Sequence, residues 1–121
     1  MRRNKKDDGR NYLEFKPERN ENLVWRQDEN GKVTLDVENR GLFNRIAQKL
    51  LKKPKVSHIY LDELGSFVWP LIDGNMDIVA LGVMVREKFG EKAEPLYPRL
   101  AKYFQILESY HFVKLAPKSD T

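Results

Sequence analysis

The sequence contains no cysteine, and this absence narrows the chemistry that is open to the protein. Without thiols the chain forms no disulfide, binds no metal through thiolates and has no cysteine nucleophile. No apolar run approaches the roughly 20 residues that span a bilayer. The charged N-terminus is not followed by the apolar segment of a secretory signal. We therefore expect a cytoplasmic protein with no membrane contact.

Histidine and glycine are also sparse. The two histidines, His58 and His111, lie far apart in apolar contexts without carboxylates at ligand spacing, whereas a zinc site needs three or four converging ligands. The seven glycines occur singly, so no phosphate-binding loop is present. Asp62 and Glu63 open a predicted helix, and capping explains both. We expect no metal, no cofactor, no catalytic residue and no enzymatic activity.

The chain is long enough for one domain and contains more basic than acidic residues. The 121 residues have a formal net charge of +4 and suffice for a single modest core. We expect a flexible basic tail at 1–11, a single domain over 12–115 and a frayed C-terminus at 116–121. Two basic clusters attract either nucleic acid or an acidic peptide, or are simply solvated. They comprise Arg2, Arg3, Lys5, Lys6 and Arg10, and Arg45, Lys49, Lys52, Lys53 and Lys55.

The first half of the domain predicts a hairpin and a helix. Residues 23–27 and the alternating apolar pattern of 33–37 predict two antiparallel strands. Between them, Asn30-Gly31 favours the left-handed conformations of a tight turn. Apolar residues at helical spacing then predict a helix over 41–53, which ends before Pro54.

A strand that leads directly into a short apolar helix is the most informative feature of the chain. Residues 56–61 predict the third strand, and Asp62 is the expected N-cap of a helix that runs to about Ile72. Trp25 and Trp69 are expected to anchor the core.

Two more helices follow this joint. The second is expected to start after Asp77 and to end at Phe89. The third begins near Pro95, with its regular start delayed by Pro98, and residues 112–115 add a short final strand. The order predicts an α+β, winged-helix-like domain. In it a three-stranded antiparallel sheet is followed by a three-helix bundle, with one extra inserted helix.

Several of these segments together resemble a known family. They are the run from Leu61 to Trp69 (LDELGSFVW), Ile72-Asp73-Gly74, Lys88-Phe89-Gly90 and Leu107-Glu108. Their order and spacing are similar to those of the PqqD family, named for a pyrroloquinoline quinone biosynthesis protein. The resemblance covers roughly residues 23–112. The helix at 41–53 is not part of the family's minimal pattern and looks like a subfamily insertion.

The resemblance implies a non-catalytic recognition element for ribosomally made, later modified peptides. Such a domain holds the leader of a precursor peptide as an added strand beside the third strand and the third helix. It presents the core to a modifying enzyme, often a radical-SAM enzyme. Basic side chains suit the acidic residues of leader segments. The implied peptide-binding residues are Ser57, His58, Ile59, Tyr60 and Leu61 on the strand, and Arg99, Lys102, Tyr103 and Leu107 on the helix.

Alternatives remain open at this stage. In the competing interpretation, either residues 12–15 or the helix at 41–53 covers the edge of the third strand. The second helix departs from the family pattern, because Val79, Gly82, Val83 and Met84 form an apolar patch. That patch suggests self-association or enzyme docking, or packing against the inserted helix.

Two other functions compete with peptide binding. One is a winged-helix nucleic-acid-binding module, although the second helix offers few basic residues, Arg86 and Lys88, on its exposed side. The other is a structural dimerisation domain, since open strand edges invite self-pairing.

Overall fold

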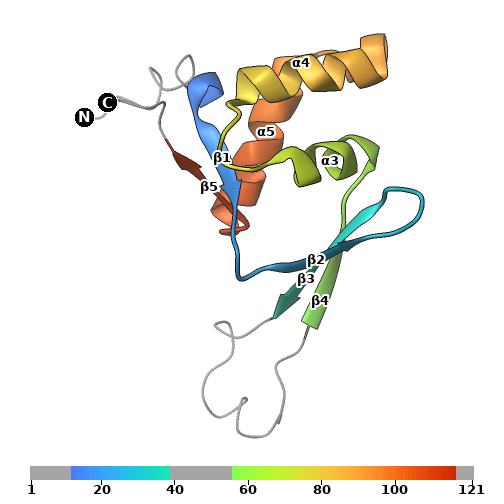
Figure 1. The fold of residues 1–121 in the computed structure, drawn as a ribbon, viewed down its shortest axis with the longest axis vertical. Coiled ribbons are helices and arrows are strands. Elements are labelled where there is room, and N and C mark those ends of the chain that lie inside the picture. The colour runs from blue at the N-terminus through green and yellow to red at the C-terminus, as the bar shows by residue number, and fades with distance from the viewer. Residues whose placement is uncertain (1–11, 39–55, 117–121) are drawn as a thin grey trace, which may run out of the picture.

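The computed structural model describes residues 12–38 and 56–116 (Figure 1). Within these ranges the chain has an α+β architecture with a three-stranded antiparallel sheet, a separate two-stranded sheet and three α-helices. The predicted tail at 1–11, the predicted helix at 41–53 with its basic cluster, and residues 117–121 lie outside the described residues.

The larger sheet confirms the predicted three-stranded antiparallel arrangement. Leu35 in the central strand is paired with Trp25 on one side and Ile59 on the other. The spatial order is β2 (Val24–Gln27), β3 (Val33–Glu38) and β4 (Val56–Tyr60).

The turn between β2 and β3 is fixed by one carboxylate. Asp28 Oδ1 accepts hydrogen bonds from the backbone N–H groups of Asn30 and Lys32, both at 2.9 Å. Gly31 adopts a φ of 87°, whereas Asn30 does not adopt a positive φ. The prediction that both residues take left-handed conformations is therefore wrong for Asn30, because the Asp28 side chain supplies the turn's hydrogen bonds instead.

The helices begin where the sequence predicts but differ in two details. Asp62 and Asp77 are confirmed as N-caps. The first helix ends as an α-helix earlier than expected and continues as a 3-10 turn, because Pro70 has no N–H for helical bonding. The elements are α3 (Glu63–Val68), η2 (Trp69–Leu71), α4 (Ile78–Phe89), η3 (Gly90–Ala93) and α5 (Leu96–Ser109).

Pro98 does not delay α5, contrary to the prediction. The helix begins at Leu96, so Pro98 is its third residue. The first N–H groups of a helix have no partner within it, and a proline there removes no helical hydrogen bond.

The two-stranded sheet was only half predicted. The final strand is present as β5 (Val113–Ala116), and it pairs with β1 (Lys16–Arg19). Strand β1 follows the 3-10 turn η1 (Tyr12–Glu14) and was not predicted, because it has four residues and contains Pro17. Ala116 was expected to be frayed but is paired with Lys16.

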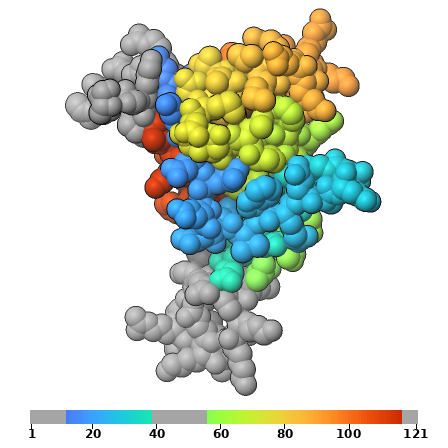
Figure 2. All heavy atoms as spheres, in the orientation of Figure 1, coloured from blue at the N-terminus to red at the C-terminus, as the bar shows by residue number. Residues whose placement is uncertain are grey.

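The core lies between the helices and one face of the three-stranded sheet. Trp69 is fully buried, as predicted, whereas Trp25 is half-buried and packs edge-on against it, with ring centroids 6.1 Å apart. In the space-filling view the surface of α3 lies between that of α4 and that of the β2–β3 hairpin (Figure 2). Among the residues that the structure describes, no helix is both long and apolar enough to cross a membrane.

Candidate functional site

One edge of strand β4 is open within the described residues. Strand β3 lies on one side of β4, and no described strand lies on the other. Leu61 donates its N–H to the carbonyl of Val33 at 3.0 Å. Alternate residues of an antiparallel strand direct their backbone groups to the same side. Ile59 therefore also bonds toward β3, while His58 and Tyr60 direct their N–H and C=O groups outward.

Helix α5 contacts the joint that follows this strand. At one end, the Tyr103 hydroxyl donates to the carbonyl of Gly65 at 2.9 Å. A Cβ built on Gly65 would lie 3.0 Å from Tyr103 Cε1 and 3.4 Å from Leu61 Cβ. At the other end, Tyr110 and Val56 line the same hollow, whose volume is about 670 Å³. Through Tyr103, α5 is thus fixed to the joint between β4 and α3.

Helix α5 and strand β4 both carry exposed side chains, some of them apolar. On α5, Ile106 is 45% exposed and Tyr110 is 63% exposed, at helical spacing from the half-buried Tyr103. Lys102 is exposed on the same helix, and Tyr60 on β4 is 69% exposed. We call the outward backbone of β4, together with Lys102, Tyr103, Ile106 and Tyr110, the β4 edge site.

Not every predicted binding residue belongs to this site. Leu107 is only 4% exposed and lies in the core, so its side chain is not accessible. Arg99 donates to the carbonyl of Lys92 at 2.9 Å, which directs it toward η3. The side chains of Ile59 and Leu61 are half-buried against the core, and their N–H groups point toward β3, so neither residue faces the open edge.

Among the remaining predicted residues, Ser57, His58 and Tyr60 belong to β4, and Tyr103 contacts Gly65 just beyond that strand. Lys102 is exposed on α5. Ile106 was missed, although it follows Tyr103 by three positions and so shares its helix face.

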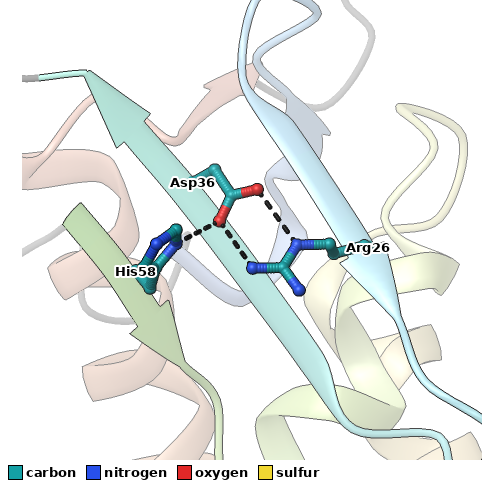
Figure 3. Close-up of polar contacts among 3 residues, drawn as sticks. All are labelled: Arg26, Asp36 and His58. Carbon is teal, nitrogen blue, oxygen red and sulfur yellow. Dashed lines mark hydrogen bonds and ion pairs between the residues drawn. The ribbon is translucent and has the colours of Figure 1, made fainter. Parts of the chain in front are cut away.

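An interaction across all three strands lies on the sheet face opposite the helices (Figure 3). Arg26 binds Asp36 through two hydrogen bonds, Nε to Oδ2 and Nη2 to Oδ1, both at 3.1 Å. His58 Nδ1 lies 2.7 Å from Asp36 Oδ1. The hydrogen bonds from Arg26 and then from His58 lower the pKa of Asp36 to about 2.

The sequence suggested that His58 has no carboxylate nearby, but in the structure it lies beside Asp36. The strand register pairs it directly with Asp36. A residue 22 positions away in sequence becomes a neighbour only through that register, and spacing along the chain does not show it.

One of the two proposed covers for the edge lies elsewhere. The carbonyl of Phe15 accepts the N–H of Ile78 at 3.1 Å, which fixes the segment at 12–15 beside the start of α4. This segment does not cover β4. The other proposed cover, the helix at 41–53, lies outside the described residues.

The predicted apolar patch on α4 is smaller than expected. Val79 and Val83 are exposed, but Gly82 is buried beneath Tyr97, where an added Cβ would lie 2.6 Å from Tyr97 Cε1. Gly82 therefore serves the close approach of the Tyr97 ring rather than an exposed surface.

Comparison with known proteins adds no relative. No protein-family model, no curated protein and no solved structure matches this chain. Over 12–38 and 56–116, no three or more His, Cys, Asp or Glu side chains gather in a way that would hold a metal ion. The candidate site is thus defined by its own geometry.

Proposed function

We propose that this protein is a non-catalytic, winged-helix-like peptide-binding module of the PqqD type. It holds the leader of a ribosomally made precursor peptide by strand addition to β4 and presents the peptide to a modifying enzyme. The observation that supports this proposal is the outward direction of the His58 and Tyr60 backbone groups on a strand with a single described neighbour.

Strand addition suits the physics of this edge. An added strand satisfies backbone donors and acceptors that have no partner in any described strand, and its alternate side chains meet the surfaces on either side. Here one set of alternate side chains would face α5, where Ile106 and Tyr110 offer apolar surface. The other set would lie on the sheet face that carries His58.

The edge is held in place before any ligand arrives. Ser66 in α3 accepts the N–H of Val33 at 2.9 Å and donates its hydroxyl to the carbonyl of Leu61 at 3.2 Å. One side chain thus fixes β3, the end of β4 and α3 to one another. A preorganised edge avoids the ordering cost that a flexible strand adds to binding.

The direct experiment is a titration with the short peptides encoded by reading frames beside the gene, followed by amide chemical shifts. We expect shifts in Val56–Tyr60 and in α5. If no neighbouring peptide binds, or if shifts lie only on other surfaces, the proposal is wrong.

A pair of variants tests strand addition itself. In Tyr60→Pro the outward N–H is lost without loss of a sheet hydrogen bond, so we expect a folded protein with at least tenfold weaker peptide binding. Tyr60→Ala removes the side chain but keeps the N–H, and it separates the two contributions. Equal affinity of Tyr60→Pro and Tyr60→Ala would contradict strand addition.

Self-association is the second candidate function. The same edge fits a strand from another copy of the chain, and Tyr60 and Val56 would be covered by it. Light scattering over a range of protein concentrations distinguishes the two functions. Without a ligand, a peptide-binding module is monomeric, whereas a dimerisation domain self-associates as its concentration rises.

A further inference from the structure

His58 occupies the outermost position of a row of side chains across the sheet. The register pairs Val24 with Asp36 and Asp36 with His58 on the face away from the helices. A strand added to β4 would place one of its own residues directly beyond His58, with Cβ atoms about 5 Å apart. This inference rests on the proposed function, and it concerns which side chain that ligand residue has.

The imidazole presents one nitrogen to the sheet and leaves the other for a ligand. Asp36 is ionised and can only accept hydrogen bonds, so Nδ1 of His58 carries a proton and donates it across 2.7 Å. Figure 3 shows the second ring nitrogen turned away from Asp36. The side chain of His58 is 48% exposed, which leaves Nε2 accessible from the open edge.

We propose that the β4 edge site selects a peptide strand with an aspartate or glutamate opposite His58, and that binding takes up one proton. The proton comes from solvent and adds to Nε2. The imidazolium then donates its Nδ1–H to Asp36 and its Nε2–H to the ligand carboxylate. No other bond forms or breaks.

The outermost group on this face, His58, favours an acidic ligand residue when it is protonated. The groups that face His58 are Arg26 from β2, Asp36 and Glu38 from β3, and the Tyr60 hydroxyl from β4. Figure 3 shows the helices on the other side of the sheet. Arg26 already balances the charge of Asp36. Protonation of His58 adds a positive charge at the open margin, and a ligand carboxylate neutralises it.

The sign of the pH dependence follows from which state binds the proton more tightly. A carboxylate within about 4–6 Å raises the pKa of a histidine by about one unit or more in the complex. Binding is then stronger at about pH 6 than at about pH 8. One unit corresponds to a tenfold change in affinity, so we expect about tenfold weaker binding at about pH 8.

The experiment uses peptides of about 12 random residues, displayed as a library and selected against the full chain at about pH 6. Enriched peptides that protect the His58 and Tyr60 amides are expected to share an acidic residue at one fixed position. Changing that residue to its amide in the peptide should remove the difference in affinity between about pH 6 and pH 8.

Two histidine variants separate this inference from a general pH effect. His58→Gln should abolish the tenfold pH difference, because glutamine does not titrate. His111→Asn, at the chain's other histidine, should leave it intact. Selected peptides that protect the β4 amides but bind equally at both pH values would overturn the acidic preference and leave strand addition standing. Failure to select any peptide that protects those amides would overturn the proposed function itself.

Discussion

At the scale of single residues, Ser66 explains how the strand-to-helix joint holds its shape. Ser66 is 4% exposed, and its hydroxyl lies among β3, the end of β4 and α3, where it accepts the N–H of Val33. A buried N–H without a partner is costly, so this serine is an obligatory partner rather than a tolerated polar group.

We expect Ser66→Ala to lower the free energy of unfolding by about 1–3 kcal/mol, because Val33 then has a buried N–H without an acceptor. Urea unfolding followed by fluorescence measures it. Ser109→Ala is the matched control, since Ser109 is exposed and bonds only within its own helix end. We expect that control to change stability by less than about 0.5 kcal/mol. Equal effects of the two changes would contradict the role of Ser66.

At the scale of elements, α3 and α5 meet at a glycine. Gly65 lies under Tyr103, whose ring also packs edge-on against Phe104 with centroids 5.0 Å apart. Tyr103 is held by its hydroxyl bond to Gly65 and by this packing, so it has little freedom to move. The position of α5 against α3 depends on that contact.

Gly65→Ala should therefore destabilise the protein, although alanine normally favours a helix over glycine by about 1 kcal/mol. The new Cβ would lie 3.0 Å from Tyr103 Cε1 and 3.1 Å from Asp62 Oδ1, and overpacking of this kind costs about 1–3 kcal/mol. Thermal unfolding measures the change. Gln105→Ala, an exposed change on α5, should be nearly neutral. A stabilised Gly65→Ala variant would show that α5 is not fixed there.

The elements also show how far the sequence alone leads. The caps at Asp62 and Asp77 and the alternation of β3 were predictable, because each depends on neighbouring residues. Strand β1 was not, since four residues with a proline have no periodic signal and exist as a strand only through pairing with β5. The Asp36–His58 contact was hidden for the same reason, because register is a long-range property. The resemblance assigned Leu107 to the site, whereas its side chain is buried in the core.

At the scale of the whole molecule, charge argues against duplex DNA as the partner. The formal net charge is +4, because the sequence has 22 basic and 18 acidic residues. On the exposed side of α4, Arg86 is already paired with Glu94 at 3.3 Å. A helix whose arginine is neutralised in this way is poorly suited to phosphate contacts.

We therefore expect weak binding to random duplex DNA with a shallow dependence on salt. Each neutralised phosphate adds about 0.9 to the slope of log affinity against log salt concentration, and we expect a slope below about 2 in magnitude. Fluorescence anisotropy from low to physiological salt measures it. A slope typical of many phosphate contacts would instead favour the nucleic-acid-binding alternative.

Whether an outside chain pairs with β4 is most directly tested by amide hydrogen exchange at three successive residues. In the free, monomeric protein we predict rapid exchange at His58 and Tyr60 and slow exchange at Ile59, because only Ile59 directs its N–H toward β3. A bound peptide should slow His58 and Tyr60 and leave Ile59 unchanged. Slow exchange at His58 and Tyr60 in the free monomer would mean that the chain already covers its own edge, and peptide capture at β4 would then be wrong.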